Sequence, residues 1–265
     1  MSLKRSCRVR LLFPFTSRGR EIRKNNTVNQ HFNWQESDTM VVLSLSLVCI
    51  SFIVYHFFVY TSSNEQRWAG ENGPIRRIIF QRLAGLMIMG VIPFAVVLLV
   101  TQQPPSYFGF GFQNGPKVLW WTLAASVVIL PLSFLNARKP FNLSMYPQIR
   151  VKEWSYSLLF RSNLTWVLYL IGYETLFRGI LFFPLLDHLG LVPAVAINVT
   201  IYSLAHIPKG ITETVGAIPF GIVVCMAGYA TGVIWFPILV HSLMALSSEW
   251  FSLYFQPEMR LKKSV

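Results

Sequence analysis

Residues 40–61 read MVVLSLSLVCISFIVYHFFVYT, a run that contains no charged side chain. A helix needs roughly 20 apolar residues to cross a hydrocarbon core about 30 Å thick, so this run predicts a membrane-spanning helix. Six further apolar stretches follow, at 83–101, 118–134, 164–186, 191–206, 215–232 and 233–255. The sequence therefore predicts an all-α fold, a polytopic membrane helix bundle of about seven transmembrane helices.

The composition of the whole chain agrees with a lipid environment. Of the 265 residues, 53% are hydrophobic and 13% are charged, and the mean hydropathy is +0.47. Globular domains carry about 25% charged residues, so a disordered chain is excluded and an ordinary soluble domain is disfavoured. The net charge of +12 lies in the loops between apolar blocks. We therefore expect membrane lipids as partners and no nucleic acid.

Lys and Arg in short loops stay on the cytoplasmic side, because they resist translocation. With seven spans the basic loops share one side, which predicts a multi-pass protein of a cell membrane, the bacterial inner membrane, with its C terminus in the cytoplasm. Residues 1–39 break this pattern with eight basic residues on the outer side. Either translation starts at Met40, which we favour, or this segment lies on an anionic cytoplasmic surface and the number of spans differs by one.

Ionisable residues inside the spans point to a site, since charges in lipid are costly and usually functional. Glu174 and Arg178 lie four residues apart, so they share one helix face in the order that favours an ion pair. Such a pair alone is as consistent with a structural role as with a functional one. Tyr202 and His206 share a face of the next span, and His241 lies in the last one.

Two chemistries fit two histidines and a carboxylate that converge from different helices. A carboxylate and an imidazole can deprotonate a confined water for attack on an amide carbonyl, while the second imidazole donates to the oxyanion. Alternatively, the three groups can bind zinc with an open coordination position. The sequence does not distinguish a divalent metal from a metal-free site, and both chemistries end in hydrolysis.

Three motifs follow in a fixed order on separate spans: Glu-x-x-x-Arg-Gly at 174–179, aromatic-x-x-x-His at 202–206 and Trp-Phe-Pro-Ile-Leu-Val-His at 235–241. Over about residues 150–250 the chain resembles the CPBP family of intramembrane proteases (CAAX prenyl endopeptidase and bacteriocin-processing, also called Abi). The resemblance implies an endopeptidase that hydrolyses a peptide bond near the membrane surface in a peptide or membrane-associated protein. The residues that it implies as catalytic are Glu174, Arg178, His206 and His241.

The chain departs from the family pattern at two positions. The family has Glu-Glu-x-x-x-Arg and His-x-x-x-Asn, but Tyr173 replaces the first Glu and Ala245 replaces the Asn. A phenol is a poor base at neutral pH, and one oxyanion donor contributes about 3 kcal/mol. The alternative is a catalytically degenerate member that acts as a membrane binding or immunity protein. Glu249, two turns beyond His241, is a hypothetical replacement acid.

The resemblance divides the chain into four parts: a basic segment at 1–39, N-terminal transmembrane helices at 40–149, a CPBP-like helix bundle at 150–256 and a cytoplasmic tail at 257–265. A transporter with a proton relay would predict repeats or broken helices, which the sequence does not display. The position of the Glu174 carboxylate discriminates between the main alternatives. We expect it to face His206 across a polar cavity in an active enzyme, and to face only Arg178 in a degenerate relative.

Overall fold

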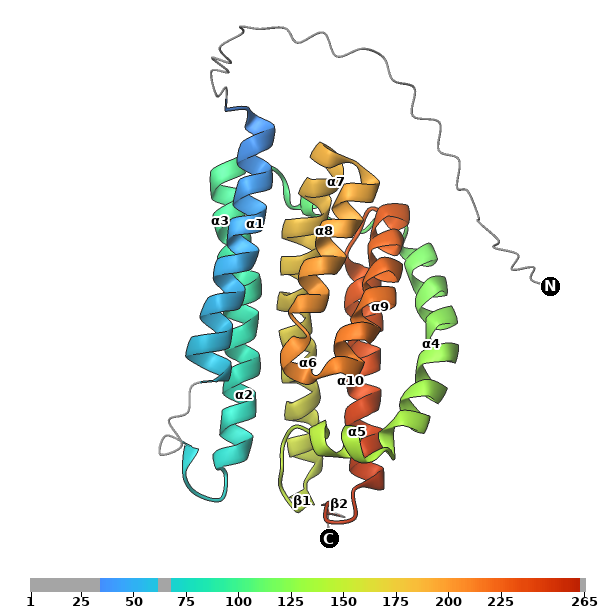
Figure 1. The fold of residues 1–265 in the computed structure, drawn as a ribbon. Coiled ribbons are helices and arrows are strands. Elements are labelled where there is room, and N and C mark those ends of the chain that lie inside the picture. The colour runs from blue at the N-terminus through green and yellow to red at the C-terminus, as the bar shows by residue number, and fades with distance from the viewer. Residues whose placement is uncertain (1–33, 62–67, 263–265) are drawn as a thin grey trace, which may run out of the picture. The chain divides into compact units, whose positions relative to one another are not determined.

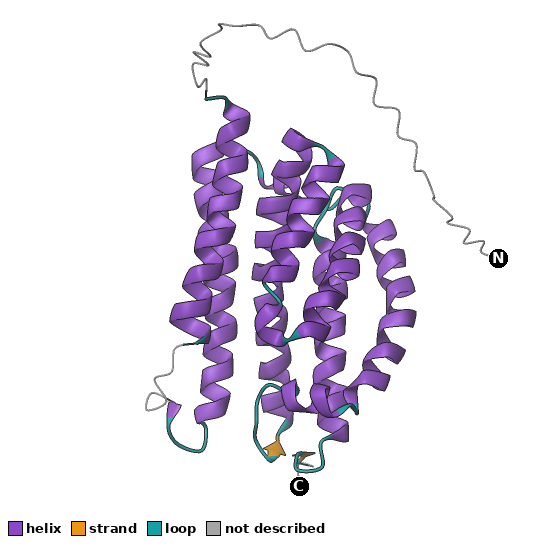
Figure 2. Ribbon diagram, in the orientation of Figure 1, coloured by secondary structure: helices purple, strands orange, loops and turns teal. Residues whose placement is uncertain are grey.

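The computed structural model describes residues 34–61 and 68–262, and helices make up most of them (Figures 1 and 2). The predicted basic segment at 1–39 lies almost wholly outside the described residues. The helices are α1 (Glu36–Val54), α2 (Gly73–Gly85), α3 (Ile92–Thr101), α4 (Gly115–Ala137), α5 (Pro140–Met145), α6 (Tyr156–Glu174), α7 (Phe183–Leu189), α8 (Leu191–Leu204), α9 (Ile211–Thr231) and α10 (Trp235–Phe255). π-Helical stretches continue α1 and join α2 to α3 and α6 to α7, at Tyr55–Tyr60, Leu86–Val91 and Thr175–Phe182.

Five helical runs among the described residues are long and apolar enough to cross a membrane: Ser37–Tyr60, Gly73–Thr101, Gly115–Ala137, Tyr156–Leu189 and Ile211–Thr231. The predicted all-α membrane bundle is thus confirmed, and the protein is a multi-pass membrane protein. The number seven is not confirmed. Helix α8 has only 14 residues, and α10 is not among the five runs, since His241, Glu249 and several serines make it more polar.

The helical run that contains the fourth predicted span, 164–186, is longer than predicted. It begins at Tyr156, because the Ser155 side chain caps the helix by accepting a hydrogen bond from the Leu158 amide at 3.1 Å. It ends at Leu189, because Gly190 adopts a φ of 80° that most residues avoid. This run is also the most buried of the five, so it forms the centre of the bundle.

Helix α6 packs against α2 and α10, and α10 packs against α4 and α9 (Figure 1). Further along the same run as α2, the π-helical stretch Leu86–Val91 meets α6 at two glycines, Gly90 and Gly172. A Cβ atom on Gly172 would lie 2.8 Å from the Cα of Leu86, and one on Gly90 would lie 2.7 Å from the Cα of Gly172. Only glycines allow the two backbones to approach this closely.

The short helix α8 determines where the site lies. Its 14 residues span about 21 Å at 1.5 Å per residue, which is less than the hydrocarbon core. Pro208 and Gly210, whose φ is 92°, form the tight turn that follows it. The chain therefore turns back part-way along α6 and α10, as Figure 1 shows. His206 lies in this turn and is therefore buried inside the bundle, away from its two ends.

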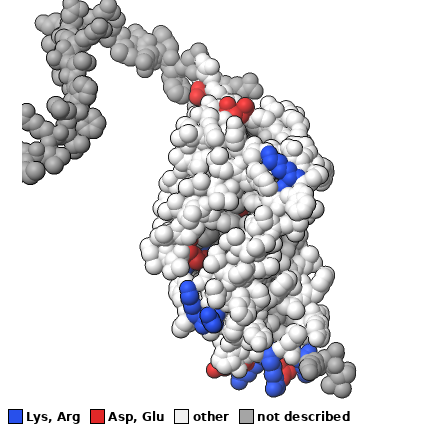
Figure 3. All heavy atoms as spheres, turned by 90° about the vertical axis from the view of Figure 1, so that its right-hand side faces the viewer, with Lys and Arg blue, Asp and Glu red and all other residues white. Residues whose placement is uncertain are grey.

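Charged side chains gather at one end of the bundle. The first turn of α2, helix α5 and two short strands, β1 (Glu153–Trp154) and β2 (Arg260–Leu261), lie at that end (Figure 1). The strands pair in parallel, and Arg260 donates to the Glu153 carboxylate at 2.9 Å. Above this end, most residues on the face in Figure 3 are uncharged and drawn in white. That distribution is what a membrane protein needs, since lipid covers the apolar belt.

Candidate active site

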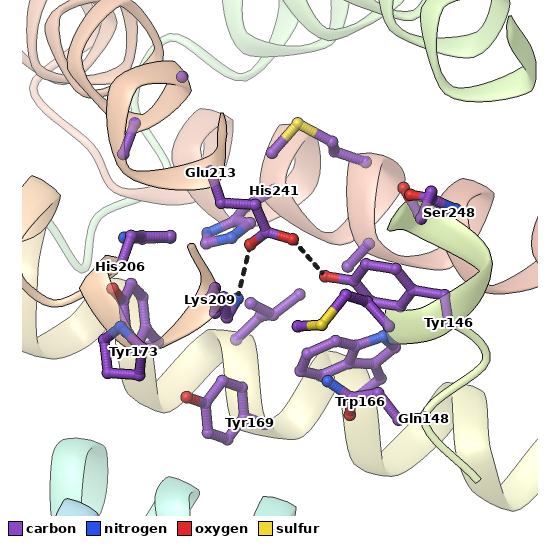
Figure 4. A pocket seen from close by; sticks show the side chains of 18 of the residues that line it. Tyr146, Gln148, Trp166, Tyr169, Tyr173, His206, Lys209, Glu213, His241 and Ser248 are labelled. Carbon is purple, nitrogen blue, oxygen red and sulfur yellow. Dashed lines mark hydrogen bonds and ion pairs between the residues drawn. The ribbon is translucent and has the colours of Figure 1, made fainter. Parts of the chain in front are cut away.

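His206 and His241 come from different helices and line one cavity of about 810 Å³. Walls of the cavity come from α1, α2, α4, α6, α9, α10 and the segment that connects α5 to α6. Figure 4 shows both imidazoles among the labelled lining residues, together with Tyr173 and Glu213. The two histidines that the sequence singled out therefore line the same cavity.

The hydrogen bond of His206 determines its tautomer. Its Nδ1 lies 2.8 Å from the main-chain oxygen of Tyr202. A carbonyl oxygen can only accept, so Nδ1 carries the proton and donates it. In the neutral ring Nε2 is then the unprotonated nitrogen, which can accept a proton or a hydrogen bond. His206 is thus held as an acceptor in the cavity.

His241 is held by a carboxylate instead. Its Nδ1 lies 2.6 Å from Oε1 of Glu174, and Oε2 of Glu174 lies 3.1 Å from Nη1 of Arg178. Glu174 and Arg178 are fully buried, and the guanidinium of Arg178 lies 4.1 Å from the ring centroid of Tyr202. Glu174 thus joins the arginine to the histidine.

The position of Glu174 fits neither of the two expected arrangements. Neither Glu174 nor Arg178 is among the residues that line the cavity. The structure records no contact between Glu174 and His206, and the carboxylate contacts His241 as well as Arg178. Glu174 therefore orients His241 from behind and is not positioned to bind a molecule in the cavity.

Both departures from the family pattern face this cavity. The ring of Tyr173 packs against both histidines, with its centroid 6.2 Å from that of His206 and 5.7 Å from that of His241 in edge-to-face geometry. Ala245 also lines the cavity. Both replaced positions therefore belong to the lining of the cavity.

Comparison with protein families decides the relationship of this region. Residues 155–247 match the family model of type II CAAX prenyl endopeptidase Rce1-like proteins. We call this matched segment, residues 155–247, the Rce1-like domain. The matched segment runs from the cap of α6 into α10 and contains every predicted site residue, so the resemblance to CAAX prenyl endopeptidases is confirmed there. Comparisons with curated proteins and with solved structures gave no match.

Glu249, two residues beyond the matched segment, occupies a separate polar cluster. It is fully buried, its Oε1 lies 3.4 Å from a guanidinium nitrogen of Arg82, and it accepts from Ser162 Oγ at 3.2 Å. Its other oxygen accepts from the Gln148 amide at 3.4 Å. Because Glu249 does not line the cavity, its hypothetical role as a replacement acid has no support in the geometry. It joins α10 to α2, α6 and the segment before β1.

A further acid, Glu213, lines the cavity, although no sequence motif indicated it. Its carboxylate lies 3.5 Å from Lys209 Nζ and accepts from the Tyr146 hydroxyl at 3.3 Å (Figure 4). Burial, and next the negative charge of Glu213, raise the pKa of Tyr146 well above its usual range, so this phenol stays a donor. The sequence signal is the spacing in His206-Ile-Pro-Lys-Gly-Ile-Thr-Glu213, which places both side chains beside one tight turn.

The expected zinc alternative needs three convergent ligands. Over residues 34–61 and 68–262, no group of three or more His, Cys, Asp or Glu side chains is arranged to hold a metal ion. The oxygen of Glu174 is engaged by the Nδ1 proton of His241.

Proposed function

We propose that the protein is an intramembrane endopeptidase that hydrolyses a peptide bond in a peptide or membrane-associated protein. One observation carries the proposal: two imidazoles from different helices line one cavity of the Rce1-like domain, and each is held through Nδ1 by a separate acceptor. Two ring nitrogens, the Nε2 atoms, remain for chemistry. Such preorganisation of general acid–base groups is what catalysis of hydrolysis requires.

In the proposed reaction a water molecule donates a hydrogen bond to Nε2 of His206. His206 takes the proton as the water oxygen attacks the carbonyl carbon, and the carbonyl π electrons move to the oxygen. Protonated His241 donates from Nε2 to this oxyanion, and Glu174 stabilises the imidazolium. When the intermediate collapses, the C–N bond breaks and His206 gives its proton to the leaving amine. Glu174 and Arg178 act as positioning residues.

The proposal places the cavity in the membrane with its basic end toward the cytoplasm. The start of α2, α5 with its flanking segments and the two strands lie at one end of the bundle (Figure 1). These segments carry Arg76, Arg77, Lys139, Arg150, Lys152, Arg260 and Lys262. Lys and Arg near the ends of spans favour the cytoplasmic side. The C-terminal strand β2 belongs to this end, which supports a cytoplasmic C terminus.

A binding or immunity protein without protease activity is the second candidate, and Tyr173 favours it. This residue is only 5% exposed and packs against both catalytic histidines, where a carboxylate stands in the family pattern. Ala245 adds no hydrogen-bond donor on the other side of the cavity. In this case the cavity binds a peptide segment without cutting it.

Cleavage by purified protein in vesicles of phosphatidylcholine and phosphatidylglycerol separates the two candidates. The probes are a farnesylated CAAX peptide, the same peptide without its prenyl group, and a mixture of peptides from digested membrane proteins, with products identified by mass spectrometry. We expect products from wild type that His206→Ala and His241→Ala do not form. If wild type and both variants give identical peptides, the protein is not a protease.

A further inference from the structure

We propose that Glu213 is the catalytic carboxylate of this cavity, an inference that rests on the proposed function and extends it. Of the Asp and Glu residues that the structure describes, Glu213 alone lines the cavity. Glu174 is fully buried behind His241, and Glu249 is fully buried against Arg82. An attacking water in the cavity can therefore meet one carboxylate, that of Glu213.

A single tight turn separates His206 from Glu213 along the chain. Helix α8 ends at Leu204, and α9 begins at Ile211 after the 3₁₀ turn Ile207–Lys209. Glu213 lies in the first turn of α9, where the helix dipole favours a negative charge. Because one tight turn carries both His206 and Glu213, both side chains line the same cavity, in which Figure 4 labels them.

The partners of Glu213 contact its carboxylate without enclosing it. Lys209 Nζ lies 3.5 Å away, and the side chains of Glu213 and Lys209 are 24% and 30% exposed. The Tyr146 hydroxyl donates one further hydrogen bond at 3.3 Å. A carboxylate has about four lone-pair sites for hydrogen bonds, so acceptor sites remain for a water molecule.

Glu213 completes the proposed water activation. The attacking water donates one hydrogen bond to Nε2 of His206 and the other to the Glu213 carboxylate, which directs a lone pair of its oxygen at the carbonyl carbon. His206 takes the first proton, and the negative charge of Glu213 stabilises the imidazolium that forms. The second proton stays on the new carboxylic acid and is then lost to solvent. Glu213 itself undergoes no net change.

A purely structural ion pair between Glu213 and Lys209 is the competing explanation, and kinetics distinguishes the two. For Glu213→Gln in the vesicle assay we expect kcat to fall about 100-fold, with KM and the midpoint of thermal unfolding nearly unchanged. Glu213→Asp, which keeps the charge on a shorter side chain, should retain an intermediate kcat. Lys209→Met should alter kcat much less, and the exposed Glu258→Gln should match wild type.

The outcomes separate this inference from the proposed function. If wild type cleaves the probes and Glu213→Gln cleaves them within about twofold of the wild-type kcat, Glu213 is not catalytic and the protease remains. The inference also fails if Glu213→Gln and Lys209→Met lower the unfolding midpoint and kcat in parallel, because that is the result of a structural pair. If wild type cleaves none of the probes, the proposed function and the inference fail together.

Discussion

The Nδ1 atom of His241 lies 2.6 Å from Oε1 of Glu174, which joins the last helix to the central one inside the bundle. The opposite oxygen of Glu174 lies 3.1 Å from Arg178. Two ionisable side chains, His241 and Arg178, thus share the Glu174 carboxylate, and water has no access to Glu174 or Arg178. A buried charge of this kind depends strongly on its partner, because water cannot replace the partner when it is removed.

Glu174→Gln should destabilise the protein severely. The substitution leaves the fully buried Arg178 without its counter-charge, and loss of one partner of a buried pair typically costs about 3–5 kcal/mol. The free energy of unfolding is measured in detergent by denaturant titration. The exposed Glu258→Gln serves as the matched control and should leave stability unchanged. A second variant with both Glu174→Gln and Arg178→Met should lose less stability than the two single variants summed. Additive losses would show that the two side chains do not interact.

Glu249→Gln should lower stability without altering the chemistry. Glu249 is fully buried against Arg82, so its neutralisation leaves a buried guanidinium unpaired at a cost of about 3–5 kcal/mol. It lies outside the cavity, so kcat per folded molecule should equal that of wild type. Activity is measured at a temperature where circular dichroism shows the variant folded. A fall in kcat at full folding would assign Glu249 to the catalytic machinery after all.

Ala245→Asn should raise the rate of peptide cleavage. Ala245 lines the cavity one helical turn after His241, where an amide NH₂ can donate to the oxyanion. One such donor is worth about 3 kcal/mol, which corresponds to roughly 10²–10³ in kcat. Ala245→Leu is the control, because Leu has nearly the size and shape of Asn but no hydrogen-bond donor. This variant should bring no increase in kcat. An equal kcat for Ala245→Asn and wild type would show that no oxyanion forms beside this position.

Gly172→Ala should destabilise the bundle, whereas Gly216→Ala should not. A Cβ on Gly172 would lie 2.8 Å from the backbone of Leu86, so α6 and the Leu86–Val91 stretch would have to separate. Such overpacking typically costs about 1–3 kcal/mol. A Cβ on Gly216 in α9 meets no atom within 4 Å, and Ala is the better helix former by about 1 kcal/mol. Thermal unfolding midpoints of the two variants test this, and a similar fall in both would contradict the role of the close helix approach.

Local sequence patterns were sufficient to predict the helices and the Glu174–Arg178 pair. A long run of apolar residues indicates a helix that lipid surrounds. Residues four apart on a helix share a face because one turn contains 3.6 residues. The same patterns were wrong about the start of the fourth span, because the cap at Ser155 is a side-chain interaction that hydropathy does not record. The expected number of spans was not confirmed for a related reason, since α8 is ended by a turn and not by a loss of apolar character.

Residue order alone therefore determined the membrane bundle, the position of the Rce1-like domain and the two histidines of the candidate site. The tertiary structure decided which acidic side chains are buried and which one lines the cavity. Glu174, Glu249 and Glu213 are indistinguishable as residue types, but two are fully buried against arginines and one lies in the cavity. The physical reason is that a carboxylate's partner comes from another helix, and the distance between helices depends on packing contacts such as Gly90 against Gly172. Spacing along one chain does not encode that distance.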